Sequence, residues 1–486
     1  MPLAFRHSIL ALGLLAAACG QSGDVPVEAV VIGQPGAPLE KGVRLSYGGQ
    51  LVRAATAEGL VGFDEQGRIV PALAERWIVT DDGLSYIFRL RDGTWLDKAP
   101  LSAESAVAAL EAALAEVKGA PLAAELAGIE AVVARAGRVV EIQLAAPNPD
   151  FLQGLAQPEL GLARKGRGAG PMRLTSERRV AILTPIAPLR RGLPPDPDWD
   201  ERQRALRLRG LPADRAIARF EDGEASLVLG GRAESLPLAR DVGIARGRLE
   251  FDPVAGLFGF AVTGESGFLA DAEHREALAM AIDRDGLGKA FGAEGWQPTN
   301  RVVAPGMDGD TGAIGERWPG QTQEELRRVA AGRVARWRAQ HGKVALAIAL
   351  PAGPGADSLF QHVARDLAGI GVEARRAGEG APADLRLVDV VARYARASWF
   401  LAQLSCAARG APCSEEADRI AAQARREPDA AKRADLFADA AGPAAALDAA
   451  APRCRRLCRQ PLGRASLDSA GPASQVGNWR PPGAAG

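Results

Sequence analysis

The cysteines are the residues of this chain whose type and spacing most directly suggest chemistry. Cys406 and Cys413 bracket a short loop that contains glycine and proline, and in an oxidising compartment such a pair can form a local disulfide. Cys454 and Cys458 lie close together in an Arg-rich stretch, which is the spacing of half a metal site. No histidine or further cysteine pair stands near them. We therefore predict a Cys406–Cys413 disulfide and neither a bound metal nor another cofactor.

The remaining cysteine, Cys19, ends a segment that indicates export. A basic start precedes an apolar run over 9–18, and small residues lead into Cys19. The run is shorter than the ~20 residues that a membrane-spanning helix needs. The segment resembles a bacterial lipoprotein signal, in which the cysteine becomes the first residue and carries lipid, although Ala16 stands where leucine is usual. Lipidation at Cys19 would hold the protein on a membrane outside the cytoplasm, and an ordinary signal peptide with an incidental cysteine is the alternative.

No catalytic constellation is recognisable in the sequence. A nucleophile elbow, a zinc-protease helix motif and a Walker loop are all absent from it. His274, His341 and His362 stand far apart in the chain, and we interpret each as a surface or helix residue rather than a general base. We therefore predict that the protein is not an enzyme.

The composition is that of a globular protein of several domains with no net charge. Hydrophobic residues make up 47% and charged residues 24% of the 486 residues, and this length suits two to three domains. Lys plus Arg and Asp plus Glu number 59 each, so the formal net charge is zero. This balance gives no electrostatic reason to expect a nucleic-acid partner.

The elements that would position these residues alternate between strand and helix patterns. Asp82-Gly83 indicates a hairpin, and the strand after it alternates its apolar side chains. Residues 344–350 form a continuous apolar run, which is typical of a strand covered on both faces. A helix over 357–369 and a strand over 371–374 complete a strand–helix–strand unit. The pattern predicts an α/β body with an inserted β-rich region.

Three segments resemble the bacterial extracellular solute-binding proteins of family 5, the peptide/nickel class. The segment 51–110 contains Pro-Ala-Leu-Ala at 71–74, the Asp-Gly hairpin and Leu-Ser-Ala-Glu at 101–104 in the order that is usual in that family. GAGPM at 168–172 resembles the family's Gly-x-Gly-Pro step. DAEHREALAMAIDRD at 271–285 resembles its Asp…Arg-x-Ala-Leu-x-x-Ala-Ile-Asp-Arg helix.

This resemblance implies a two-lobed fold of the type II periplasmic binding proteins with an inserted β-rich subdomain. It also implies a function: the substrate-binding component of an ABC importer, which captures a peptide-like solute between its lobes and delivers it to a permease in the inner membrane. The expected protein is a monomeric periplasmic lipoprotein. The alternative is a lipoprotein of the same fold that acts as a scaffold or sensor without transport.

The predicted ligand-binding residues lie in the segment VARYARASWF. In peptide-binding members of the family an acidic residue follows the tyrosine of this cleft segment, whereas here Tyr394 is followed by Ala395 and Arg396. Arg396 would suit an acidic or carboxylate ligand, unless it is a solvated loop residue. Tyr394 and Trp399 would line the pocket, since ligand clefts favour aromatic side chains, or belong to the core.

The C-terminal segment departs from the family pattern. After Pro452 the chain becomes basic and rich in proline and glycine, so the strand that should return to the first lobe is missing or degraded. We expect a poorly ordered tail and an exposed sheet edge, and a reading-frame slip in the source gene would explain the change. The expected divisions of the chain are a lipoprotein signal peptide over 1–19, a flexible tether over 20–42, lobe I over 43–255 with the subdomain at about 63–167, lobe II over 256–452, and the tail over 453–486.

Overall fold

The computed structural model describes most of the chain between residues 25 and 462. The described ranges are 25–64, 66–118, 121–240, 242, 248–251, 255–264, 266–291, 298–303, 317–409, 413–445 and 459–462. Cys19 and the predicted export signal lie outside them. Within these ranges no helix is long and apolar enough to cross a membrane.

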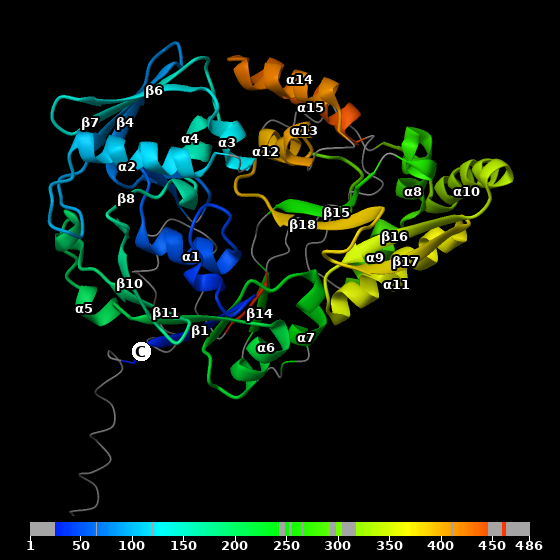
Figure 1. Ribbon diagram of the computed structural model, residues 1–486, viewed down its shortest axis with the longest axis horizontal. Helices are drawn as coiled ribbons and strands as arrows, with labels where there is room; N and C mark the ends of the chain where they lie inside the picture. Colours follow the sequence, from blue (N-terminus) through cyan, green and yellow to red (C-terminus); the bar gives the residue numbers. More distant parts are fainter. Residues whose placement is uncertain are drawn as a thin grey trace, which may run out of the picture.

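A seven-stranded sheet forms the base of the first lobe, in the order β10-β11-β12-β1-β13-β19-β14 (Figure 1). Its strands are β1 (Val27–Ile32), β10 (Met172–Glu177), β11 (Val180–Pro185), β12 (Leu206–Leu211), β13 (Leu227–Leu229), β14 (Arg248–Phe251) and β19 (Arg459–Leu462). β1 is parallel to both of its neighbours, β12 and β13. The smaller elements of this lobe are η1 (Ala37–Leu39), α1 (Tyr47–Thr56), η3 (Pro188–Arg191), α5 (Trp199–Arg202), α6 (Ala213–Glu221), η4 (Ala233–Ser235) and α7 (Leu236–Arg240).

The strand β1 shows that the flexible tether expected over 20–42 is wrong for its described part. Val30 and Val31 are buried on opposite faces of the strand, in two different clusters of apolar side chains. A parallel strand that is covered on both faces needs such a continuous apolar run instead of an alternating one. Gly33, Pro35 and Gly36, which contributed to the expectation of a linker, lie in the turn after this strand, and Ala37 in η1 is buried as well.

The strand β19 lies within 453–486, the segment that was expected to lack a return strand, so this expectation is wrong for residues 459–462. Its residues pair antiparallel with β14, and Leu462 also pairs with Leu227 of β13. Backbone groups make these ladder bonds, so the strand does not require an apolar alternation. Cys454 and Cys458 lie outside the described residues.

A second, four-stranded antiparallel sheet, β4-β5-β7-β6, is inserted between β1 and β10. The hairpin between its first two strands forms as expected: the side chain of Asp82 accepts a hydrogen bond from the backbone N–H of Leu84, and Gly83 has φ 69°. The elements of this insertion are β2 (Val61–Phe63), β3 (Ile69–Pro71), β4 (Ala74–Val79), β5 (Ser85–Leu90), α2 (Ala103–Glu116), α3 (Pro121–Leu126), β6 (Ile129–Arg135), β7 (Val139–Leu144), α4 (Phe151–Leu155), η2 (Pro158–Leu160), β8 (Ala163–Arg164) and β9 (Arg167–Gly168).

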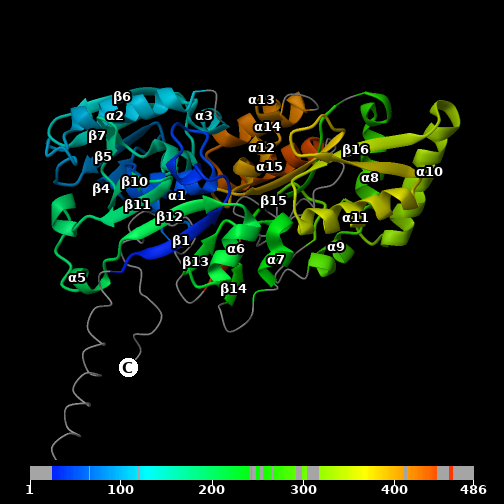
Figure 2. The same ribbon diagram turned by 60° about the horizontal axis from the view of Figure 1, so that its bottom comes forward.

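A third sheet, β15-β18-β16-β17, builds the second lobe. The apolar run expected to be a covered strand is β16, which pairs in parallel with β17 and β18. Helices α8, α10 and α11 are seen beside this sheet in both views (Figures 1 and 2). The elements are β15 (Gly256–Val262), η6 (Gly267–Ala270), α8 (Ala272–Ala281), α9 (Arg284–Phe291), α10 (Gln323–His341), β16 (Val344–Leu350), α11 (Pro354–Gly369), β17 (Val372–Gly378) and β18 (Leu385–Val391).

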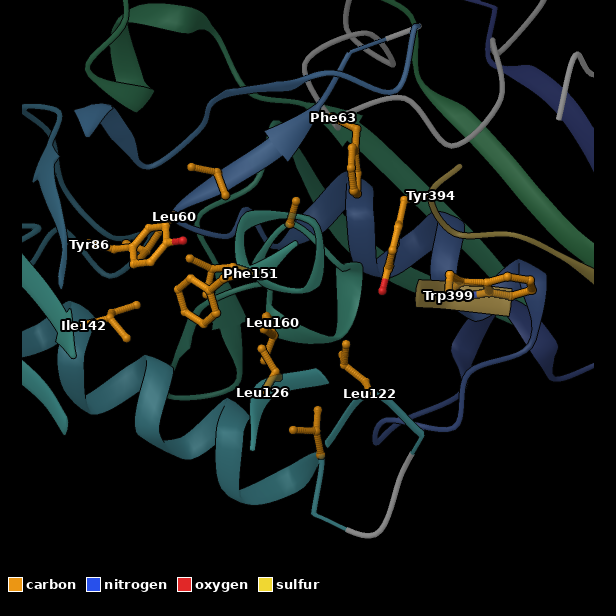
Figure 3. Close-up of a cluster of buried hydrophobic side chains, with 14 of the residues drawn as sticks. Leu60, Phe63, Tyr86, Leu122, Leu126, Ile142, Phe151, Leu160, Tyr394 and Trp399 are labelled. Atoms are coloured by element: carbon orange, nitrogen blue, oxygen red, sulfur yellow. The ribbon is translucent and has the colours of Figure 1, made fainter. Parts of the chain in front are cut away.

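The helices that follow β18 share their core with the inserted sheet. They are α12 (Ala397–Gln403), α13 (Cys406–Arg409), α14 (Glu415–Arg426) and α15 (Ala430–Ala445). One continuous apolar cluster joins Trp399 and Phe437 from these helices to Leu122 and Leu160 of the insertion. Figure 3 shows Trp399, Leu122 and Leu160 in this cluster. Helices α12, α14 and α15 therefore pack on the insertion as well as on the second lobe, where the sequence-based division placed them.

Candidate functional site

The segment 392–398, called the loop 392–398 below, runs from the end of β18 into the first turn of α12 and contacts the inserted subdomain. The hydroxyl of Tyr394 donates a hydrogen bond to Oε2 of Glu125 on α3, at 2.7 Å. Tyr394 is buried, and Figure 3 shows it beside Trp399 within the shared cluster. This loop is therefore a contact between the second lobe and the insertion of the first.

Arg396, the predicted anion-binding residue, faces a carboxylate of the protein itself. Its Nε lies 3.7 Å from Oδ1 of Asp150, and about a third of its side chain is exposed (33%). The other oxygen of Asp150 accepts a hydrogen bond from the hydroxyl of Ser398. Asp150 thus binds two residues of the loop.

Trp399, predicted either to line a pocket or to belong to the core, lies in the core. It is 3% exposed and packs edge-to-face on Phe400, with ring centroids 5.0 Å apart. Its role is to fix α12 against the insertion.

Sequence reasoning missed Arg393, which makes the shortest ion pair of the loop. Its Nη1 lies 2.5 Å from Oε2 of Glu159, whose side chain is only 2% exposed. A buried carboxylate needs such a partner, because an unpaired charge in the interior is costly. The signal for it was Glu159 itself, an acid among the apolar residues around η2, but nothing in the sequence shows that it meets a residue 234 positions later.

The local electrostatics favour the neutral forms of Glu125 and Tyr394. Burial raises the pKa of Glu125, and its hydrogen bond from Tyr394 opposes this rise. Burial, together with the neighbouring charge of Glu125, raises the pKa of Tyr394 well above its ordinary value. Tyr394 therefore remains a hydrogen-bond donor at every physiological pH.

A second polar contact between the lobes involves Asp389 on β18. Arg232, next to η4 of the first lobe, donates from Nη1 to the backbone oxygen of Asp389 at 2.9 Å. The Oδ2 atom of Asp389 is buried and, among the described residues, receives no hydrogen bond. Burial raises the pKa of this carboxyl to about 7, although the charge of Arg232 opposes the shift.

The Gly-x-Gly-Pro step has a steric reason. A Cβ atom at Gly168 would lie 2.2 Å from the backbone oxygen of Thr56, and one at Gly170 would lie 2.4 Å from the carbonyl carbon of the same residue. These glycines allow the chain to pass directly over the end of α1. Next to it, Glu58 is buried and paired with Arg91 at 2.7 Å and with Arg191.

The structure pairs Cys406 with Cys413 in a disulfide, with their Cα atoms 4.9 Å apart. The described residues contain no group of three or more His, Cys, Asp or Glu side chains that could hold a metal ion. A surface hollow of about 430 Å³ lies on and just beyond α14 and contains neither the disulfide nor any residue of the loop 392–398.

Comparison with known proteins identifies the class of this fold. It matches the murein tripeptide binding protein MppA of Escherichia coli with a TM-score of 0.77 and 20% identity, over 93% of this chain and 97% of that chain. It matches Haemophilus influenzae OppA in complex with the peptide RPPGFSPFR with a TM-score of 0.77 and 16% identity, over 94% and 99% of the two chains. The fold is therefore that of the two-lobed periplasmic binding proteins.

The sequence adds a family relationship. Residues 68–175 match the model of the bacterial extracellular solute-binding proteins, family 5 middle region. A segment of 121 residues is 37% identical to the "Probable deoxycholate-binding periplasmic protein YgiS" of Escherichia coli K12, and it covers 21% of this chain and 23% of that protein. A segment of 35 residues is 66% identical to the "Probable di/tripeptide-binding protein 5" of Pseudomonas aeruginosa and covers 7% of each. The resemblance to family 5 that the sequence predicts is thus confirmed, on alignments that span less than a quarter of these two relatives.

Proposed function

We propose that this protein is the substrate-binding component of an ABC importer, which captures a peptide-like solute between its two lobes and delivers it to a membrane permease. The observation that carries the proposal is the match of nearly the whole chain to two binding-protein structures, the murein tripeptide binding protein MppA and OppA in complex with the peptide RPPGFSPFR. The family 5 segment at 68–175 supports it independently. Binding proteins of this shape work by closing their lobes around a solute, so the proposal assigns no catalytic step to any residue.

The proposed location follows from the same relatives. MppA and YgiS, both of Escherichia coli, are named as periplasmic binding proteins. We propose that this chain acts in the periplasm as a monomer, anchored to a membrane by lipid on Cys19 beside its permease.

A scaffold or sensor of the same fold is the second candidate. The observation in its favour is that the loop 392–398 already binds carboxylates of the protein itself, through Arg393, Tyr394, Arg396 and Ser398. A protein whose lobes bind each other in this way has less need of a solute to close them.

The deciding experiment is mass spectrometry of the protein purified from its native host without denaturation. If the protein is the binding component of an importer, we expect a bound small solute, and calorimetry with that solute should show saturable binding. If the protein carries no solute and binds no member of a peptide library, the importer function is excluded and the scaffold or sensor function is left.

A further inference from the structure

The seven-stranded sheet of the first lobe has one face on which a helix packs at β1 and β13. Val30 of β1 and Phe220 of α6 belong to one apolar cluster on this face, and Figure 2 shows α6 beside β13. Glu28 lies two positions before Val30 on the same face of β1, and its register partner on β12 is Arg207. Both of these side chains are partly exposed, at 33% and 28%. The side of β10, β11 and β12 that shares this face, together with Glu28 and the turn between β10 and β11, is called the open face below.

The side chains of the open face carry more positive than negative charge. Glu28 pairs with Arg207 at 2.8 Å and with Arg209 at 3.1 Å. Arg207 also lies 3.8 Å from a carboxylate oxygen of Glu177 on β10. Near the start of β10 Arg173 is exposed, and among the described residues no ion pair involves it. The two carboxylates therefore balance the arginines of β12, and Arg173 adds an excess positive charge.

The turn between β10 and β11 adds two arginines in a backbone conformation that arginine disfavours. Arg178 and Arg179 form the two-residue loop of this hairpin, with φ 47° and 67°. Such a turn needs a positive φ at both positions and is usually Asn-Gly, because a Cβ atom makes this conformation unfavourable. Both side chains are exposed, and in the described part of the chain neither takes part in an ion pair. The turn geometry gives no reason for arginine at these positions, whereas an anionic partner would.

The open face begins close to the proposed site of lipid attachment. Val27, the first residue of β1, follows Cys19 by eight residues. An extended chain spans at most ~3.6 Å per residue, so β1 starts within about 29 Å of a lipidated Cys19. β10 lies three strands from β1 in the sheet, which is about 15 Å at the usual strand spacing. A lipid anchor would therefore hold this face near the headgroups of the same membrane.

We propose that the open face docks on the anionic phospholipid headgroups of the membrane that holds the lipid anchor. Guanidinium groups bind phosphate oxygens through pairs of hydrogen bonds, and basic residues beside an anionic leaflet strengthen membrane attachment. The inference rests on the lipid attachment in the proposed function and adds the surface of the first lobe that faces the membrane. The lipid limits the distance from the membrane, and the arginines set the orientation.

The test uses the lipidated protein on vesicles of phosphatidylcholine with or without phosphatidylglycerol, which carries the anionic headgroup. A fluorophore on Thr175→Cys of the open face, in a Cys454→Ser/Cys458→Ser background, reports contact with a quencher on the lipid headgroups. We expect about twofold or more quenching with phosphatidylglycerol than without it, and loss of this difference at high salt, because screening weakens such contacts. Arg178→Asn/Arg179→Gly should reduce the difference by about half or more. This variant receives the residues that the turn prefers, so it should fold at least as well as the unchanged protein.

Two controls separate docking from net charge and from mere proximity to the membrane. Arg328→Gln/Arg336→Gln removes the same charge from exposed positions of α10 in the second lobe and should keep the full difference. A fluorophore on Glu324→Cys of the same helix should show no increase in quenching with phosphatidylglycerol. Equal quenching at Thr175→Cys with and without phosphatidylglycerol, or an equal loss in both double variants, would overturn the inference and leave the anchor and the importer standing. Release of the unchanged protein from vesicles of phosphatidylcholine alone would show that Cys19 carries no lipid and would overturn the inference together with the anchor, whereas the search for a bound solute still decides the importer.

Discussion

At the scale of single residues, Asp389 is a carboxyl group whose burial disfavours its charged form. Its carboxyl lies at the contact between the lobes with one oxygen buried and, in the described part of the chain, without a hydrogen-bond donor. Arg232 and Glu234 are the charged groups of the first lobe that act on it, with opposite effects on its pKa. Burial outweighs the attraction of Arg232, so the carboxyl resists ionisation.

We predict that Asp389→Asn stabilises the unliganded protein at pH 8. The pKa of this carboxyl is about 7 in the folded protein, above its ordinary value of 3.8, so the folded protein loses stability as the pH rises from about 4 to about 7. Each pKa unit corresponds to about 1.4 kcal/mol, and we expect a gain of roughly 1–3 kcal/mol at pH 8 and a smaller gain at pH 5. Thermal melts at both pH values measure it. Glu416→Gln on the surface of α14 is the control, and an equal gain at both pH values would contradict the prediction.

The proposed lipid attachment site Cys19 gives a second prediction at this scale. We expect Cys19→Ser to yield unprocessed precursor or protein released from the membrane fraction, because the lipid attachment site is gone. Fractionation of host cells followed by immunoblotting measures this. Full release of the unchanged protein into the soluble fraction after export would show that Cys19 carries no lipid.

The disulfide is checked separately, by alkylation of denatured protein without reductant followed by peptide mapping. We expect Cys406 and Cys413 to remain unmodified until a reductant is added, because the structure joins them in one bond. Alkylation of both residues without reductant would disprove the bridge.

At the scale of elements, the chain crosses closely over the end of α1 at Gly168. We predict that Gly168→Ala destabilises the protein by about 1–3 kcal/mol, because the new methyl group would lie 2.2 Å from a backbone oxygen that cannot easily move. Denaturant unfolding measures the change. Gly128→Ala is the matched control, since a Cβ there meets no atom within 4 Å. Equal midpoints for the two variants would argue against the steric role.

The elements also show what the sequence could reveal. The Asp82-Gly83 hairpin and the apolar strand β16 carry strong local signals, and they predicted the α/β elements. The two-lobed fold was implied by the resemblance of the segments 51–110, 168–172 and 271–285 to family 5. β1 was missed because a central parallel strand has no alternating pattern and stands among glycines and prolines. Arg393 was missed for a different reason: its partner Glu159 is close only in the folded chain. Local patterns predict elements, whereas a charge pair across two lobes is a property of their packing.

At the scale of the whole molecule, the pair of Arg393 and Glu159 should couple the lobes. We predict that Arg393→Ala increases the radius of gyration of the unliganded protein in small-angle scattering, because the loop 392–398 loses its most buried ionic contact. A double-mutant cycle with Glu159→Gln should give a coupling energy of about 1–3 kcal/mol. The more exposed pair of Arg135 and Glu141, with side chains 51% and 14% exposed, serves as the control cycle. Independent effects of the two substitutions, together with an unchanged radius, would rule out a coupling role.

The apolar cluster shared by the insertion and the C-terminal helices has a consequence for how the chain folds. Leu122 and Leu160 cannot complete their packing until Trp399 and Phe437 have been synthesised, more than 200 residues later. Contacts between such distant residues slow folding, since a long loop must close before they form. While the second half of the chain is still emerging, the insertion exposes apolar surface that it will later bury. The last quarter of the sequence therefore decides when the first third becomes stable.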